Sequence, residues 1–276
     1  MSKASIPQLK DYLNKKKLAK ISIKSEIEKH PSISPLFIKK NWYQKVDEQI
    51  ILWECDSEKS LIERDITIPE YELFRYLEED SILERFLTAV DAIEGLTVAD
   101  RSRYRNWKET KCRLFSRQVS QIYSALFEIL VIGDLISSET NVEPYHANID
   151  GRFKIDRRYI YFEIKSLQQS HYDLTGIGVG GVQHDEHQIL TALKEKAAQL
   201  APFCDEPTLL FLSLYRLADI ITGEWFTNDF FNMVEGSIIS GVVLFSWFTA
   251  GRGKKVLINS RAKNPLSSSE VSFLNA

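Results

Sequence analysis

Cysteine is scarce in this chain, which holds Cys55, Cys112 and Cys204 and no CxxC pair. Three thiols so widely separated argue against a disulfide framework and against a cysteine-based zinc site. The first residues carry lysines without an apolar core segment, so we expect no signal peptide. Long apolar runs are also lacking, so we expect no membrane span and a protein of the cytoplasm.

The chain also lacks a global excess of positive charge, since its formal net charge is −3. Basic residues are instead concentrated locally: residues 1–24 hold seven lysines against Asp11, and residues 101–117 hold seven Lys or Arg against Glu109. Both segments are candidate phosphate-contacting surfaces. The alternative interpretation is a solvated helical face whose acidic partners lie elsewhere in the sequence.

No internal repeat, low-complexity tract or long Gly/Ser linker is visible, so the domain division comes from a change of pattern. Residues 1–100 mix short charged helical stretches with a strand-like run at 49–54. They predict a mainly helical accessory region for target recognition, dimerisation or contact with a protein partner. Residues 101–276 form the second predicted domain.

The second domain shows an alternation of helical and strand patterns. The expected elements are a long helix from about residue 99 to 135, ending near Ser137, strands at 146–155 and 158–167, a helix at 185–200, and strands at 208–215 and 238–248. This order predicts an α/β protein with a mixed central sheet flanked by helices.

The segment 158–167, RYIYFEIKSL, places Glu163 and Lys165 on the same face of its strand because side chains alternate. A two-residue turn at Asp156 and Arg157 would make a hairpin in which Asp150 lies opposite Glu163. A three-residue turn would shift this pairing by one residue. The first register brings two carboxylates and an ammonium group together.

Two neighbouring carboxylates repel each other unless a cation lies between them, and hard oxygen ligands favour Mg²⁺ or Mn²⁺. Such an ion polarises a phosphodiester and acidifies its bound water, while a nearby lysine orients that water. The pattern therefore predicts phosphodiester hydrolysis. The competing interpretation is an exposed hairpin in which Lys165 pairs with Asp150 or Glu163.

Glu128 interrupts the apolar stretch 125–132, ALFEILVI, where a charge needs a partner or a metal. On a helix, Arg117, Gln121 and Ser124 fall within about 40° of Glu128, which predicts a polar stripe able to guide a phosphate backbone. Further candidate phosphate contacts are Arg113, Lys194 and Lys196, for which solvated charge is the alternative.

Together, Glu128 in a helix, Asp150 in a strand and Glu163-Ile164-Lys165 in the next strand resemble the PD-(D/E)XK nuclease superfamily. The resemblance covers about residues 113–216. It implies a restriction-endonuclease-like αβββαβ core and Mg²⁺-dependent cleavage of nucleic acid, with double-stranded DNA as the expected substrate and Mn²⁺ as an alternative ion. Restriction, defence and repair are the processes such nucleases serve.

By the same resemblance, Asp150 and Glu163 would be metal ligands, Lys165 would position the attacking water, and Glu128 would be a further metal contact. The chain departs from the superfamily at Ile149, where proline is common. The first core strand is also hard to separate from the second around residues 142–147. Cleavage of both strands requires two active sites, which makes a homodimer an expected assembly.

Two other interpretations of function remain open. One is a catalytically inactive nuclease-fold subunit that binds nucleic acid or serves as a scaffold. The other is a dinucleotide-binding oxidoreductase, because Gly176, Gly178 and Gly181 have G-x-G-x-x-G spacing before a helix. Polar residues 168–173 separate these glycines from the preceding strand, so a loop flanking the active site is favoured over a Rossmann turn.

Histidines and aromatic residues of the C-terminal half are further candidates for a site. His184 and His187 would need His171 or His146 to chelate a transition metal, and the spacing favours helix caps or solvated surface. The aromatic residues 225–231 suit a core or an interface, and nothing in their pattern selects base stacking.

Overall fold

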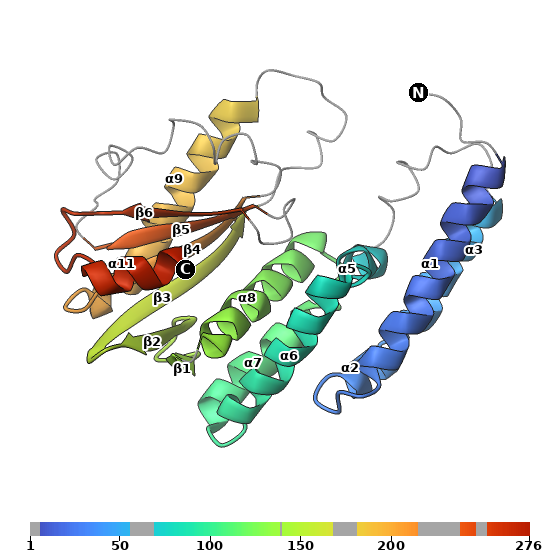
Figure 1. Cartoon of the computed structure of the whole chain (residues 1–276), viewed down its shortest axis with the longest axis horizontal. Coiled ribbons are helices and arrows are strands. Elements are labelled where there is room, and N and C mark those ends of the chain that lie inside the picture. Colours follow the sequence, from blue (N-terminus) through green and yellow to red (C-terminus); the bar gives the residue numbers. More distant parts are fainter. Residues whose placement is uncertain (1–5, 56–68, 139, 168–180, 215–237, 247–252) are drawn as a thin grey trace. The chain divides into compact units, whose positions relative to one another are not determined.

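A computed structural model describes residues 6–55, 69–138, 140–167, 181–214, 238–246 and 253–276 (Figure 1). The chain divides into two compact units, Met1–Gly133 and Asp134–Ala276. The domain boundary predicted between residues 100 and 101 stays a prediction.

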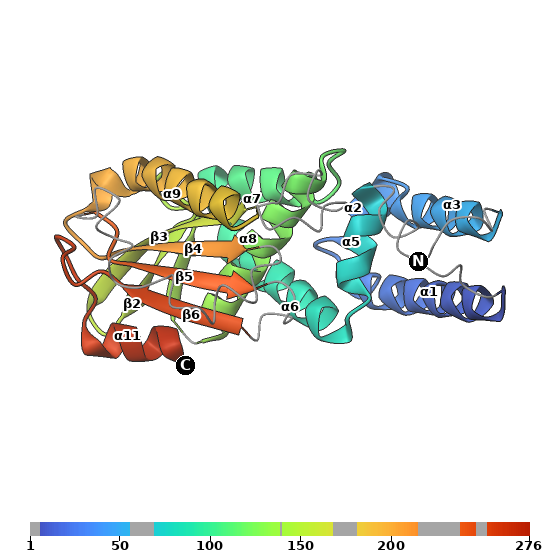
Figure 2. The same ribbon diagram turned by 90° about the horizontal axis from the view of Figure 1, so that it is seen from above.

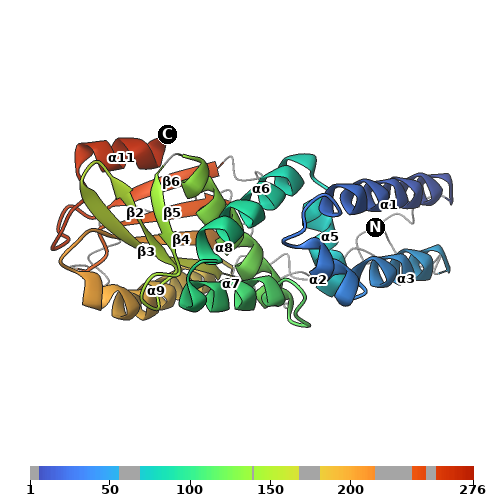
Figure 3. The same ribbon diagram turned by 90° about the horizontal axis from the view of Figure 1, so that it is seen from below.

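The first unit is helical in its described residues, as expected. Its helices are α1 (Ile6–Ile27), α2 (Ser34–Lys39), α3 (Trp42–Cys55), α5 (Pro69–Leu77), α6 (Asp80–Thr97), α7 (Arg101–Arg113) and most of α8 (Val119–Ser137). Helices α1 and α3 run side by side (Figure 3). The strand expected at 49–54 is wrong, because these residues continue α3. Trp42, Val46 and Ile50 recur every four residues and are buried, which is the period of a helix.

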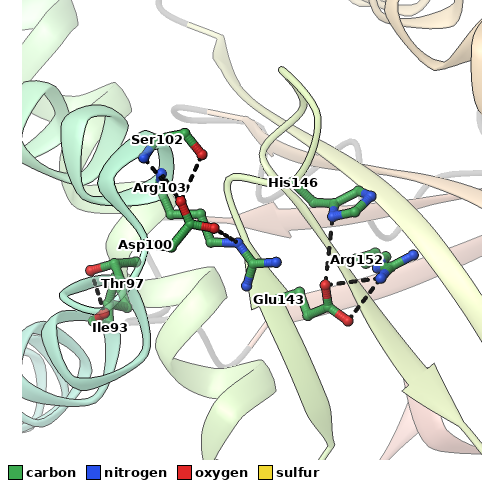
Figure 4. A network of polar contacts seen from close by, with 8 residues as sticks. All are labelled: Ile93, Thr97, Asp100, Ser102, Arg103, Glu143, His146 and Arg152. Carbon is green, nitrogen blue, oxygen red and sulfur yellow. Dashed lines mark hydrogen bonds and ion pairs between the residues drawn. The ribbon is translucent and has the colours of Figure 1, made fainter.

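The helical pattern from residue 99 to Ser137 forms two helices. Helix α7 begins after Asp100, whose carboxylate accepts hydrogen bonds from the backbone N–H groups of Ser102 and Arg103 (Figure 4). Helix α8 ends at Ser137, as predicted. Helix α8 is long and apolar enough to cross a membrane by length and composition, contrary to the expectation that no segment is. However, 67% of its 18-residue apolar window is buried. Such burial is consistent with the core helix of a soluble protein.

The second unit contains a six-stranded sheet in the order β1-β2-β3-β4-β5-β6. Its strands are β1 (Asn141–Pro144), β2 (Gly151–Ile155), β3 (Arg158–Leu167), β4 (Thr208–Leu214), β5 (Gly241–Ser246) and β6 (Gly253–Ile258). Strands β3, β4 and β5 are parallel, whereas the β1-β2, β2-β3 and β5-β6 pairs are antiparallel. The predicted α/β class with a mixed sheet is confirmed.

Helices cover both faces of this sheet. Helix α9 (Gly181–Leu200) connects β3 to β4, with the short helix η2 (Ala201–Phe203) after it, and α11 (Ser268–Asn275) ends the chain (Figure 2). On one face, Leu193 and Ala197 of α9 pack in a core with β4 and β5 residues. On the other face, Phe273 of α11 contacts Phe153 of β2.

One predicted strand is wrong in its first half. Residues 146–150 belong to a turn between β1 and β2, and the earlier residues 141–144 form β1. Tyr145, Ala147 and Asn148 have positive φ angles, a conformation that interrupts any strand. Two of the predicted features lie outside the described residues. They are the glycines Gly176 and Gly178 and the aromatic residues 225–231, whereas Gly181 begins α9.

Candidate active site

The β2-β3 hairpin has the predicted register. Ile155 pairs with Arg158 across a two-residue turn, in which Asp156 has a positive φ of 53°. The ladder runs to the pair Gly151 and Phe162. Asp150 was expected inside a strand, but it lies directly before β2. Its position continues the ladder opposite Glu163.

Asp150 is held at the middle of the Glu163-Ile164-Lys165 segment. Its Oδ2 accepts a hydrogen bond of 2.6 Å from the backbone N–H of Ile164. Within a strand, the N–H and C=O of one residue point to the same neighbour. The carbonyl of Ile164 is thus directed to the same side as the Asp150 carboxylate, just beyond the end of the β2 ladder.

Glu163 is a buried carboxylate, with an exposed fraction of 2%. Its Oε2 is 2.5 Å from Nζ of Lys196 on α9. Lys165, on the same face of β3, is 37% exposed and lies 3.6 Å from Glu195. The described ion pair of Lys165 is therefore not to Asp150 or Glu163, as the exposed-hairpin interpretation required.

Glu128 finds its partners on the neighbouring helix α7. Its Oε1 accepts a hydrogen bond of 2.7 Å from Thr110, and its Oε2 is 2.5 Å from Arg113. The sequence predicted that this buried charge needs a partner, and the structure supplies a guanidinium group. Arg113, expected to contact phosphate, is thus engaged with Glu128.

Of the other candidate phosphate contacts, Lys196 is paired with Glu163, and the remaining three lie on exposed surface. Arg117, Gln121 and Lys194 are exposed, and Gln121 is hydrogen bonded to Ser116 and Gln118. Arg117 precedes α8 instead of continuing its polar face. Their role toward nucleic acid stays a prediction.

Several lysines of the two basic segments form ion pairs with acidic residues that are distant in the sequence. Lys16 and Lys20 of α1 form ion pairs with Glu78 and Asp47. In the segment 101–117, Lys111 lies 2.5 Å from Glu94. These contacts agree with acidic partners that lie elsewhere in the sequence, but Lys16 and Lys111, with side chains 12% and 7% exposed, do not lie on a solvated face.

A charged cluster beside Asp150 was missed by the sequence reasoning. Glu143 of β1 accepts two hydrogen bonds of 2.9 Å from Arg152 of β2, and His146 Nδ1 lies 3.5 Å from Glu143 (Figure 4). The guanidinium group of Arg152 also lies over the ring of Tyr159 at 4.1 Å. Burial opposes the charge of Arg152, but hydrogen bonds to Glu143 and Tyr161 raise its pKa. The pairing of β1 with β2 places Glu143 opposite Arg152. The sequence reasoning missed this pairing because it treated the turn between the two strands as part of a strand.

The donor set at Asp150 and Glu163 fits Mg²⁺ or Mn²⁺ better than a transition metal that prefers nitrogen or sulfur. In the described part of the chain, no three His, Cys, Asp or Glu side chains gather in one group. Magnesium is commonly held by one or two carboxylates, with waters and substrate phosphate completing its shell. Asp150, Glu163 and the carbonyl of Ile164 offer oxygen atoms of this kind.

Comparisons of the chain with protein-family models, with curated proteins and with solved structures found no match. Its class is accordingly defined by its own fold and site. It is an α/β protein whose mixed sheet carries a buried Glu163 paired with Lys196, with Asp150 hydrogen bonded to the backbone of the next residue, Ile164.

Proposed function

We propose that this chain is a metal-dependent nuclease that hydrolyses phosphodiester bonds of nucleic acid, with DNA as the substrate that its resemblance favours. The observation that carries the proposal is the hydrogen bond from Ile164 N–H to Asp150. It anchors one carboxylate beside the strand segment that carries both Glu163 and Lys165. The order α8, β1, β2, β3, α9, β4 supports a restriction-endonuclease-like αβββαβ core.

Each residue has a distinct task in this proposal. Asp150 and Glu163 hold the cation, which when bound polarises the phosphodiester and acidifies a bound water. Lys165 lies two residues from Glu163, roughly 7 Å along the strand, with its ammonium group partly exposed. It donates hydrogen bonds to the attacking water or to the phosphate oxygen on which charge develops. Glu128 is not among the proposed metal ligands, because Thr110 and Arg113 bind both of its carboxylate oxygens.

The test is cleavage of plasmid, single-stranded DNA and RNA by the full chain in Mg²⁺, Mn²⁺ or EDTA. Asp150→Asn keeps an oxygen for Ile164 N–H but removes the charge, and Lys165→Met removes the ammonium group. We expect both to lower the cleavage rate by about 100-fold or more. The matched controls, Asp205→Asn and Lys263→Met, alter an exposed ion pair and should leave the rate unchanged.

Equal cleavage by Asp150→Asn and wild type would overturn the site. Metal binding that depends on Asp150, together with no cleavage of any substrate, would favour the inactive nucleic-acid-binding subunit instead. Co-purified NAD or flavin, detected by absorbance or mass spectrometry, would favour the oxidoreductase.

A further inference from the structure

One largely buried lysine of the second unit, Lys196, has no task in the proposed mechanism. Nζ of Lys196 lies 2.5 Å from Oε2 of Glu163, and the two side chains are 15% and 3% exposed. Among the described residues, Lys196 is the only group bonded to this carboxylate, so Oε1 is left for another ligand. Lys196 thus holds one of the two oxygens of a proposed metal ligand.

The position of Lys196 on α9 is one where an apolar residue is expected. Leu193, Ala197 and Leu200 are buried on the side of α9 that packs against the sheet, and Lys196 falls within that stripe by helical spacing. Lys194, two residues earlier, is exposed. An ammonium group is costly in such a place unless it is paired. The lysine is accordingly explained by its partner, Glu163, and not by packing.

A divalent cation at Glu163 would compete with this ammonium group. Both carry positive charge, both are attracted to the same carboxylate, and burial leaves their mutual repulsion weakly screened. The repulsion acts whether the cation uses Oε1 or displaces Lys196 from Oε2. Removal of the lysine charge should therefore make the cation bind more tightly.

We propose that Lys196 is the resident counterion of the metal site. It neutralises and orients Glu163 while no cation is bound, and its charge sets the affinity of the site for a divalent ion. The inference rests on the proposed function, because it takes Glu163 as a metal ligand. Lys196 is a positioning residue, since it acts through Glu163.

The experiment is titration of the full chain with Mn²⁺ alone, followed by isothermal calorimetry. Lys196→Gln removes the charge but keeps a hydrogen-bond donor, and we expect Mn²⁺ to bind about tenfold more tightly than to wild type. Lys196→Arg keeps the charge and should bind as wild type does. Lys194→Gln is the matched control on the same helix, with an expected change below about twofold. Glu163→Gln should abolish binding.

A merely structural ion pair predicts the opposite result. Loss of Lys196 would then leave Glu163 poorly oriented, and Mn²⁺ would bind equally or more weakly. If Lys196→Gln behaves in that way while Glu163→Gln abolishes binding, the counterion role is overturned and the metal site stands. If wild type and Lys196→Gln both fail to bind Mn²⁺, the proposed function fails and the counterion role falls with it.

A second charge-free variant covers the case in which Lys196→Gln does not fold. Lys196→Met suits the apolar stripe of α9 and must show the same tighter binding. If both variants are folded but unstable without Mn²⁺, their melting temperatures must rise more with Mn²⁺ than that of wild type. A smaller rise would contradict the counterion role.

Discussion

Glu128 and Glu163 are both buried carboxylates, but they differ in how many of their oxygens are bonded to neighbouring side chains. Both oxygens of Glu128 are engaged, by Thr110 and Arg113. Glu163 uses Oε2 for Lys196, and Oε1 has no described bond. A carboxylate with both oxygens satisfied is suited to a structural role, whereas one with an available oxygen is suited to a ligand.

The Glu128-Arg113 pair should contribute to the stability of the first unit. Arg113→Met leaves Glu128 buried with an uncompensated charge, and we expect a loss of about 2 kcal/mol in the free energy of unfolding, less than for a fully buried pair because the Arg113 side chain is 35% exposed. Chemical denaturation measures the change. The control is Arg105→Met, whose pair with Glu109 is exposed and should matter little. Unchanged stability with weaker DNA binding would instead assign Arg113 to phosphate contact.

At the scale of elements, helix α8 approaches α6 closely at Gly133. A Cβ built at Gly133 would lie 2.2 Å from Cβ of Ala89 and 3.0 Å from its Cα. Because backbone atoms are involved, a side chain at this position cannot be accommodated by a rotamer change alone. The close packing of these two helices therefore depends on glycine.

Two glycine substitutions should have opposite effects. Gly133→Ala forces α6 and α8 apart and should destabilise the protein by about 2 kcal/mol. Gly95→Ala, in α6, meets nothing within 4 Å and should stabilise it by roughly 0.5–1 kcal/mol, since alanine is the better helix former. Thermal melting of both variants provides the measurement. Similar stability of the two would show that the helices do not pack as described.

The elements that sequence reasoning predicted well were those with a simple period and an unstrained backbone. The β2-β3 hairpin followed from the alternation in 158–167 and a two-residue turn. Strand β1 was merged with β2 because three residues between them, Tyr145, Ala147 and Asn148, adopt a conformation that their side chains disfavour. Pro144 directly precedes that turn and Gly151 directly follows it, so the sequence held a turn signal that the strand assignment passed over.

Other elements were missed although a signal existed. Helix α11 begins with a capping box, in which Ser267 and Glu270 bond reciprocally to each other's backbone N–H, and the spacing S-x-x-E is visible in the sequence. The run 49–54 was assigned to a strand because its window was short. A longer window includes Trp42 and Val46 and reveals the helical period of α3.

At the scale of the whole molecule, the candidate site could be predicted only where it follows from local geometry. Asp150, Glu163 and Lys165 lie on or directly beside one hairpin, so strand alternation and turn length were enough to predict its register. The contact between Glu163 and Lys196 joins residues 33 positions apart through the β3-α9-β4 connection. Periodicity places Lys196 on the packed side of α9, but the pairing partner depends on how α9 is aligned on the sheet.

Cation binding should raise the stability of the entire protein. A ligand that binds the folded state alone, present at 100 times its dissociation constant, adds about 2.7 kcal/mol to the free energy of unfolding. We therefore expect a higher melting temperature in Mn²⁺ or Mg²⁺ and a return to the original value with EDTA. Asp150→Asn should abolish the increase. An equal increase in this variant would mean that the ions act elsewhere.

The two outer strands of the described sheet have a further consequence. Strand β1 has four residues and ends in Pro144, which has no N–H to donate, while β6 carries the adjacent lysines Lys254 and Lys255. Short length, proline and clustered positive charge all oppose edge-to-edge association with another chain. The protein should consequently resist aggregation through β-sheet extension, even at the high concentrations used for crystallisation.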